Sequence, residues 1–162
     1  RKFATEISKT DTSWMRPQRR MLPFGYYLPS LHSESMGTFV SGIDTSGSID
    51  DYTLQLFGAE IKAVRLAVNP LKMVNIYCDA EVAHVDEFEQ TEELSFEAHG
   101  GGGTDFRPVF EYVESKSLRP ACLIYLTDGY GSFPDTPAPY PVLWVMTTDV
   151  QPPWGDYVRI EA

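Results

Sequence analysis

An apolar run that ends in an aspartate and leads directly into an amphipathic helix is the feature that most constrains the fold. Thr38 to Ile43 is predicted to form a buried strand, and Asp44 follows at its carboxyl end. Ser48 is predicted to cap the helix, with Asp51 completing a capping box, and Asn69-Pro70 ends it. Between these ends, apolar side chains recur at spacings of three and four residues, which predicts one buried face: Leu54, Phe57, Ile61, Val64 and Val68.

Strands alternate with helices along the rest of the chain. Met73 to Cys78 is predicted to be a second strand, and the polar run from Glu81 to Phe88 has the character of a hairpin edge strand. A helix beginning at Phe106 and three more strands follow: Ala121 to Thr127, Val142 to Met146 and Tyr157 to Ile160. This alternation predicts an α/β fold, a Rossmann-like three-layer sandwich in which helices cover both faces of a mostly parallel sheet with one antiparallel edge strand.

Oxygen-bearing side chains are predicted to gather where two of these strands end, which is where open α/β sheets bind ligands. Asp44, Ser46 and Ser48 occupy alternate positions after the first strand, and Asp128 follows a later one. Thr104 comes after four consecutive glycines, which let a backbone approach a ligand closely. Two carboxylates and three hydroxyls without a soft ligand suit Mg²⁺, with Mn²⁺ or Ca²⁺ as alternatives.

Three motifs resemble the metal-ion-dependent adhesion site of von Willebrand factor A (VWA) domains: Asp44–Ser48, Gly102–Asp105 and Thr127–Gly129. Two further segments, Trp14 to Arg20 and His99 to Phe106, resemble those of a narrower group within this family. The group consists of the VWA-like domains found C-terminal to metallopeptidase-like regions in bacterial and archaeal proteins. The resemblance covers roughly residues 12–160.

The resemblance implies a metal held directly or through water by five side chains: Asp44, Ser46, Ser48, Thr104 and Asp128. Gly103 and Asp105 are expected to support them. An Asp or Glu of a partner protein would fill the open metal position, which makes the chain a Mg²⁺-dependent protein-binding module and not an enzyme. The family context suggests partners in AAA+ ATPase assemblies. One departure is that residues 129–141 are too short and proline-rich for the helix that VWA domains usually carry there.

Other interpretations of the same residues remain. Ser48 and Thr104 could each be a helix N-cap. The glycines could cradle a phosphate, but a P-loop carries Lys directly after its glycines and Thr104-Asp105 follows here. The alternative function is a Mg²⁺-dependent phosphoester hydrolase using Asp44, although residue 46 is Ser and the three motif loops contain no Lys. The three histidines form no His-Glu-x-x-His motif, so a peptidase-like region would lie outside this chain.

Length and charge narrow the function classes. The length of 162 residues suits one domain. Residues 1–37 are predicted to be an irregular N-terminal arm, and residues 38–162 the VWA-like domain. Because the chain begins with Arg1, we expect it to be an excised piece of a longer protein. The net charge is −10, although residues 1–20 are basic, so nucleic acid is not an expected partner. No apolar run is long enough for a membrane span, and free thiols at Cys78 and Cys122 suggest a cytoplasmic protein.

Overall fold

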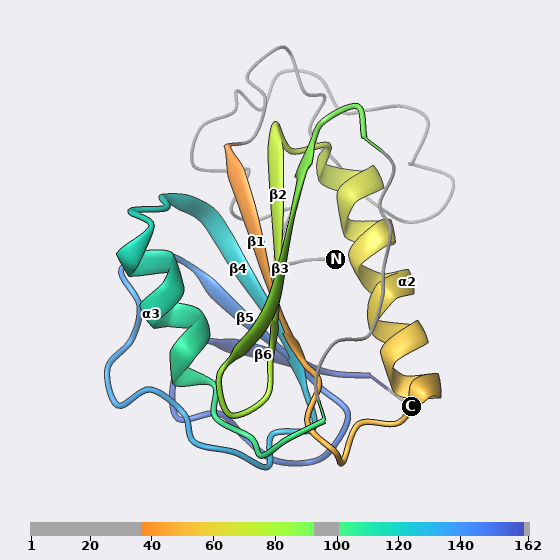
Figure 1. Cartoon of the computed structure of the whole chain (residues 1–162), viewed down its shortest axis with the longest axis vertical. Helices are drawn as coiled ribbons and strands as arrows, with labels where there is room; N and C mark the ends of the chain where they lie inside the picture. Colours follow the sequence, from red (N-terminus) through yellow and green to blue (C-terminus); the bar gives the residue numbers. More distant parts are fainter. Residues whose placement is uncertain (1–36, 93–100, 161–162) are drawn as a thin grey trace.

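The fold is built on one six-stranded sheet, as seen in a computed structural model that describes residues 37–92 and 101–160 (Figure 1). Six strands and two helices lie in this part of the chain: β1 (Thr38–Asp44), α2 (Asp51–Val68), β2 (Lys72–Cys78), β3 (Val82–Glu89), α3 (Arg107–Ser115), β4 (Pro120–Thr127), β5 (Val142–Met146) and β6 (Asp156–Arg159). The predicted N-terminal arm falls outside the described residues, except for its last residue, Gly37.

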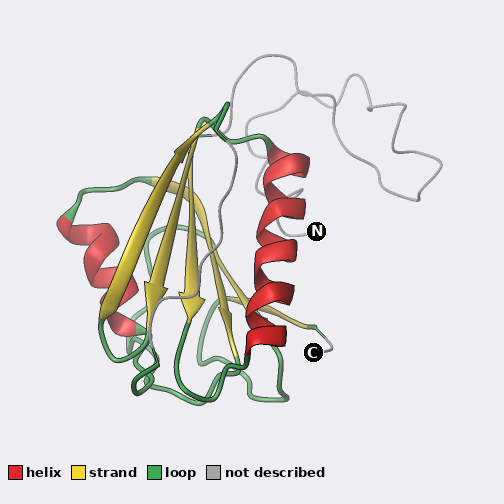
Figure 2. Ribbon diagram, turned by 45° about the vertical axis from the view of Figure 1, so that its right-hand side comes forward, coloured by secondary structure: helices red, strands yellow, loops and turns green. Residues whose placement is uncertain are grey.

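The strand order in the sheet is β3-β2-β1-β4-β5-β6. All neighbouring pairs are parallel except β2 and β3, which form the predicted antiparallel edge hairpin. The helices α2 and α3 lie on opposite faces of the sheet (Figure 2). The predicted fold class is therefore confirmed, and β1, which carries the first motif at its end, lies in the middle of the sheet between β2 and β4.

Each face of the sheet has its own apolar core because successive side chains of a strand point to opposite faces. Toward α2, buried side chains of the four central strands meet the apolar stripe of the helix: among them Phe39, Ile43, Tyr77, Leu126, Leu54, Phe57 and Ile61. Toward α3, the buried side chains are largely aromatic or β-branched: among them Val40, Ile76, Tyr125, Trp144, Phe106 and Val109. The apolar periodicity of residues 54–68 thus identified the correct face of α2.

The predicted start of α2 is wrong by two residues. Asp50, not Ser48, is the N-cap, because its side chain accepts a hydrogen bond from the backbone N–H of Thr53 at 2.8 Å. This leaves the Ser48 hydroxyl outside the helix and available to the neighbouring loop. At the other end, Asn69 adopts the left-handed conformation and its N–H bonds the carbonyl of Arg65, which closes the helix as predicted.

Thr104 does not cap α3 either. The N-cap position of this helix belongs to Phe106, whose side chain makes no capping hydrogen bond, and Pro108 sits in the first turn. The proline-rich connection between β4 and β5 contains no helix, which agrees with the predicted departure from the usual VWA arrangement. Neither helix in the described part of the chain is long and apolar enough to cross a membrane.

Candidate metal centre

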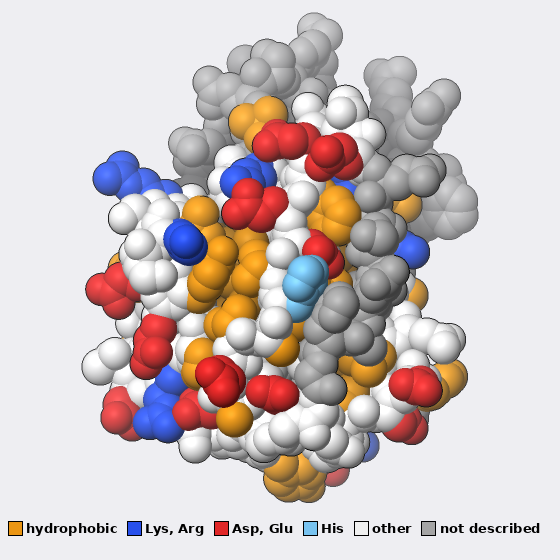
Figure 3. All heavy atoms as spheres, viewed as in Figure 1, with side chains coloured by type: hydrophobic (Ala, Val, Ile, Leu, Met, Phe, Trp, Pro, Cys, Tyr) orange, Lys and Arg blue, Asp and Glu red, His pale blue; other side chains and the backbone are white. Residues whose placement is uncertain are grey.

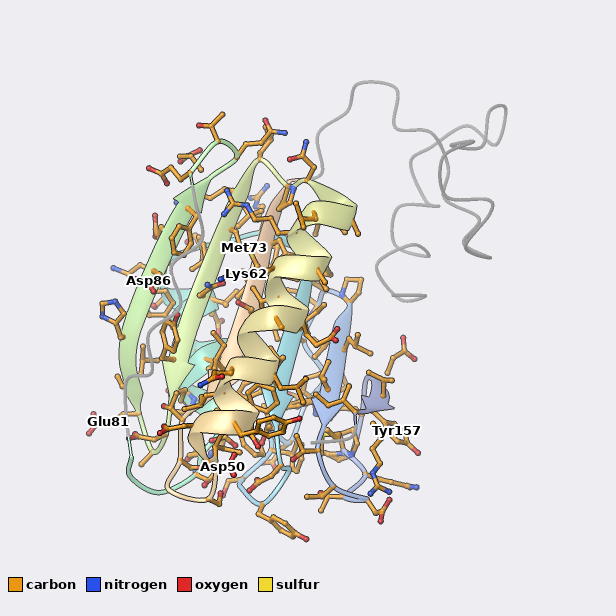
Figure 4. The ribbon with its side chains drawn as sticks, turned by 90° about the vertical axis from the view of Figure 1, so that its right-hand side faces the viewer. Asp50, Lys62, Met73, Glu81, Asp86 and Tyr157 are labelled. Carbon is orange, nitrogen blue, oxygen red and sulfur yellow. The ribbon has the colours of Figure 1, made fainter. Side chains whose placement is uncertain are left out.

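Three neighbouring parallel strands deliver an aspartate to the same edge of the sheet. Asp44 is the last residue of β1, Asp79 follows β2 and Asp128 follows β4. Carboxyl ends of parallel strands meet at one edge, so the loops after these strands surround one point. Asp50 and Glu81, which lie in or beside these loops, are seen at the lower end of the molecule in Figure 4.

Asp44 is fully buried, and both of its carboxylate oxygens accept a hydrogen bond. One oxygen accepts the backbone N–H of Ser46 at 2.9 Å, within a tight turn at the end of β1. The other accepts the hydroxyl of Thr127 at 2.5 Å, which joins the ends of β1 and β4. The carboxylate is therefore held in one orientation by two donors, one in the loop after β1 and one at the end of β4.

The Ser46 side chain hydrogen-bonds this carboxylate, and its hydroxyl oxygen lies 3.2 Å from that of Ser48. Ser46 is 2% exposed, so its oxygen is almost enclosed by the loop. Octahedral Mg²⁺ binds oxygen at about 2.1 Å, which places adjacent ligands about 3 Å apart. The spacing of the two serine oxygens therefore fits two neighbouring ligands of one Mg²⁺ ion, and the donor chemistry is the hard-oxygen type that this ion prefers.

Burial raises the pKa of the Asp44 carboxyl, because the charged form loses its hydration inside the protein. The hydrogen bonds from Thr127 and Ser46 oppose this rise, while the negative charge of Asp128 adds to it. The two strand-end aspartates thus lie close enough to repel each other, as predicted. A cation placed between them would relieve both the repulsion and the lost hydration.

The glycine loop lies against the first motif. The backbone N–H of Gly47 donates to the carbonyl of Gly102 at 3.3 Å, which brings the loop that carries Thr104 beside Ser46 and Ser48. Gly103 follows, and a Cβ added there would be in ordinary contact with Ala80. The structure therefore brings the second motif to the first one, as the sequence analysis expects.

Asp79 holds the glycine loop in this position. Its carboxylate accepts the backbone N–H of Gly102 at 3.0 Å, and its carbonyl accepts the N–H of Asp105 at 2.8 Å. Although burial raises the pKa of the Asp79 carboxyl, hydrogen bonds from the N–H groups of Glu81, Gly102 and Ala80 outweigh it and keep that pKa below its ordinary value. Asp79 is thus a charged anchor for the backbone around Thr104.

Thr104 and Asp105 are fitted between the other two loops. The Thr104 methyl group occupies the space beside Gly131, where a Cβ atom would come within 2.6 Å of it. Asp105 forms an isolated parallel bridge with Ser132. The Asp105 carboxylate pairs with Arg107, whose hydrogen bond lowers the pKa of that carboxyl. Asp105 therefore contacts the neighbouring loops through its backbone, while its charge is balanced by its own ion pair.

The third motif is fixed by the end of β4. The Asp128 carboxylate accepts the N–H of Tyr130 at 2.9 Å, and the Asp128 carbonyl accepts the hydroxyl of Thr148 at 2.6 Å. Gly129 has φ of +83°, a conformation that side chains rarely adopt, and its N–H donates to the Thr127 hydroxyl at 2.9 Å. The turn therefore holds Asp128 and the hydrogen-bond partner of Asp44 in a single unit.

Sequence reasoning missed three residues that organise the site. Thr127 belongs to the third motif, whose pattern assigns it no role, although its hydroxyl holds Asp44. Asp79 directly follows β2, as Asp128 follows β4, so the same argument from strand ends could have identified it. The thiol of Cys78 donates to the carbonyl of Asp105 at 3.3 Å, a contact that no sequence pattern announces. Among the described residues, no group of three or more His, Cys, Asp or Glu side chains forms a conventional metal cluster.

The sequence comparisons agree with this architecture. A family model described as "VWA-like domain (DUF2201)" matches residues 39–161, which is most of the chain. The chain belongs to the VWA-like domain family. It is also 30% identical over 137 residues to an uncharacterized protein of Thermotoga maritima, an alignment that covers 83% of this chain and 33% of that protein. The chain thus spans about a third of the relative's length, and membership in the family agrees with the fold described above.

Proposed function

We propose that this VWA-like domain binds Mg²⁺ at the carboxyl edge of its sheet and, through the metal, captures an Asp or Glu of a partner protein. The observation that carries the proposal is the pair of serine hydroxyls 3.2 Å apart, beside a buried carboxylate that is already oriented by two donors. When bound, the cation would supply positive charge and a coordination position for the incoming carboxylate. Mn²⁺ and Ca²⁺ are alternative ions for the same donors.

The donor set suits capture of an anion. Ser46, Ser48 and Thr104 would offer neutral hydroxyl oxygens, while Asp44 and Asp128 supply negative charge beside them. Neutral ligands compensate less of a cation's charge than carboxylates do, so such a site still attracts an acidic group. The hydrogen bonds to Asp44 hold its carboxylate in place in the protein without a ligand.

The surroundings of the site also suit a protein partner. Tyr130 lies two residues after Asp128, and Tyr52 lies in the first turn of α2, two residues after Asp50. Both tyrosines are 65% exposed. Tyrosine is enriched in protein interfaces because it offers a large apolar ring with a polar tip. Exposed aromatic rings on a loop and on the first turn of α2 would give a partner contact area beyond the single carboxylate.

The described geometry argues against the alternative, a phosphoester hydrolase with Asp44 as its nucleophile. The carboxylate is buried, and both oxygens are occupied by hydrogen bonds to Ser46 and Thr127. A nucleophile needs an oxygen free to reach the reacting atom. Among the described residues the lysines lie on α2, on β2 and after α3, away from the three motif loops. Binding is therefore the function that these residues support better.

Metal binding is tested by titrating Mn²⁺ into the protein and following the free-ion signal by electron paramagnetic resonance. We expect one ion per chain, displaced by excess Mg²⁺, and at least tenfold weaker binding in the Ser46→Ala/Ser48→Ala double variant. Ser115→Ala is the matched control, because Ser115 is an exposed serine at the end of α3, and it should bind like wild type. Equal binding by the double variant and the control would contradict the assignment of these ligands.

The two functions are separated by adding a carboxylate and a phosphoester in parallel. Acetate added to the Mn²⁺-loaded protein should lower the relaxation enhancement of water protons, as a carboxylate replaces bound water. p-Nitrophenyl phosphate with Mg²⁺ should not be hydrolysed. Turnover that is present in wild type and lost in Asp44→Ala would overturn the binding module in favour of the hydrolase.

A further inference from the structure

The α2 face of the sheet is covered over only part of its width by the described residues. The helix crosses the sheet above its central strands, and β5 and β6 lie beside it, with Tyr157 of β6 at the far side in Figure 4. An apolar groove of about 100 Å³ lies along this boundary. We call it the α2–β6 groove, and its main lining side chains come from the helix and the last strands: Ile61, Val64, Leu143, Val145 and Val158.

The groove leaves apolar surface in contact with water. Val158 is 42% exposed, although its side chain lies in line with the buried side chains of β5. The outer edge of β6 has no strand beside it among the described residues. An engineered apolar cavity of about 150 Å³ holds a benzene ring, so this open groove of about 100 Å³ has room for most of one apolar ring. A segment that covered the groove would therefore insert one such side chain and lay others along the rim.

We propose that the occupant is the N-terminal arm of this same chain, through its apolar run at residues 21–31. This run is Met-Leu-Pro-Phe-Gly-Tyr-Tyr-Leu-Pro-Ser-Leu and contains no charged residue. It lies outside the described residues and is attached next to the groove, because Phe39 at the start of β1 also lines the groove. Phe24, Tyr26 and Tyr27 are the aromatic side chains that the groove would accept.

The connecting chain is long enough for this contact. Twelve residues separate Tyr27 from Phe39 in the numbering, and an extended chain spans at most about 3.3–3.6 Å per residue, or about 40 Å. From β1 to β6 the sheet has three strand spacings, or about 14 Å. The arm can therefore reach every part of the groove without moving any described element.

Charge also favours this occupant over a second copy of the domain. Residues 1–36 contain six basic and three acidic side chains, whereas residues 37–162 contain seven basic and 20 acidic ones. Glu60 lines the groove, and Arg19-Arg20 directly precede the apolar run. Two acidic domains facing each other through this groove would repel, while a basic arm is attracted to it.

The contact is tested by measuring how fast a cysteine in the groove reacts with a maleimide in the full 162-residue chain. Val158→Cys places the thiol in the groove, and Leu66→Cys is the control, because Leu66 is 86% exposed on the same helix that borders it. The native thiols of Cys78 and Cys122 are buried, and burial raises the pKa of each to about 12, so we expect both to react slowly.

We expect the cysteine at 158 to react at least tenfold more slowly than the one at 66 in the chain with its natural arm. In the variant that also carries Phe24→Ser, Tyr26→Ser and Tyr27→Ser, the two rates should agree within about threefold. Equal rates with the natural arm would overturn the proposal. So would protection that persists in the serine variant, or protection that grows with protein concentration, which would indicate a second copy. None of these outcomes depends on metal binding.

Discussion

The carboxyl edge of the sheet and the aromatic cluster beneath α3 contribute to this domain in opposite ways. At the edge, Asp44 is buried beside a second aspartate, and burial raises the pKa of its carboxyl. In the cluster, six aromatic rings pack against one another on the same sheet: Phe106, Phe110, Tyr125, Phe133, Trp144 and Trp154. The cluster stabilises the fold, whereas the edge retains an arrangement that costs stability unless something binds there.

The two regions are also close together, which is what makes the contrast informative. Phe106 packs in the cluster, with its ring 5.2 Å from that of Tyr125, only two residues after Thr104. Its backbone N–H bonds Ser132, in the loop after Asp128. The rigid aromatic packing therefore lies directly behind the loops of the candidate metal centre. Close packing elsewhere in a protein commonly offsets the destabilisation caused by a strained or charged site. Here the aromatic cluster would offset the buried carboxylates of the candidate metal centre.

The largest test of this difference between the two regions is to remove the side chain at the centre of the aromatic cluster. Trp144 is fully buried, stacks on Tyr125 at 5.1 Å, and donates its indole N–H to the carbonyl of Trp154 at 2.9 Å. Trp144→Ala should lower the free energy of unfolding by about 3–5 kcal/mol, measured by urea denaturation. The variant that remains folded should bind Mn²⁺ within about threefold of wild type.

A much weaker affinity in folded Trp144→Ala would mean that the cluster shapes the site directly, and the comparison would fail. If that variant does not fold, Trp144→Phe keeps a ring in the cluster and tests the same point with a smaller loss of stability. A stability loss below about 1 kcal/mol for Trp144→Ala would contradict the assignment of the cluster as the stabilising region.

A second substitution removes the hydroxyl that orients the Asp44 carboxylate but leaves the charge of Asp44 unchanged. Thr127→Val keeps the side-chain shape but removes the hydroxyl that donates to Asp44. A buried acceptor left without its donor costs about 1–3 kcal/mol, so the loss should be smaller than for Trp144→Ala, and Mn²⁺ affinity should fall as well. Thr127→Ser should restore both. Thr136→Val, at an exposed position of the loop before β5, should change stability by no more than about 0.5 kcal/mol.

The smallest effect is a pH dependence that belongs to the edge alone. The pKa of Asp44 is raised in the folded protein, so between its ordinary value of 3.8 and the raised value the folded state binds more protons than the unfolded state. In the absence of metal, the contribution of Asp44 to the free energy of unfolding is therefore most favourable below about pH 4. This contribution is lost as the pH rises through the raised pKa.

This trend is measured by urea denaturation in EDTA at several values between pH 4 and pH 7. The difference in unfolding free energy between wild type and Asp44→Asn should shift against wild type as the pH rises, because the amide does not ionise. Adding Mg²⁺ should reduce that shift at neutral pH. A difference that does not change with pH would show that Asp44 is not destabilised by burial, and the edge would no longer contrast with the cluster.

The sequence by itself determined the class of fold and the edge where the candidate site lies. Apolar runs and apolar periodicity predicted five of the described strands and both helices to within a few residues, because burial imposes that pattern, and the polar character of residues 81–88 predicted the edge strand β3. The proline-rich composition of residues 129–141 excluded a helix there, since proline lacks the N–H that a helix interior needs. The ends of two predicted parallel strands then placed Asp44 and Asp128 at one edge of the sheet.

Only the tertiary structure decided which groups hold these residues in position. Thr127 meets Asp44 across 83 positions of the chain, and Asp79 reaches Gly102 across 23. Such partners depend on strand order, because β1 lies between β2 and β4 in the sheet although β4 follows much later in the chain. The same holds for the helix cap, where Ser48 and Asp50 both suit the position by sequence. In the structure the local path of the backbone places Asp50 at the N-cap of α2, and the Ser48 hydroxyl lies beside that of Ser46.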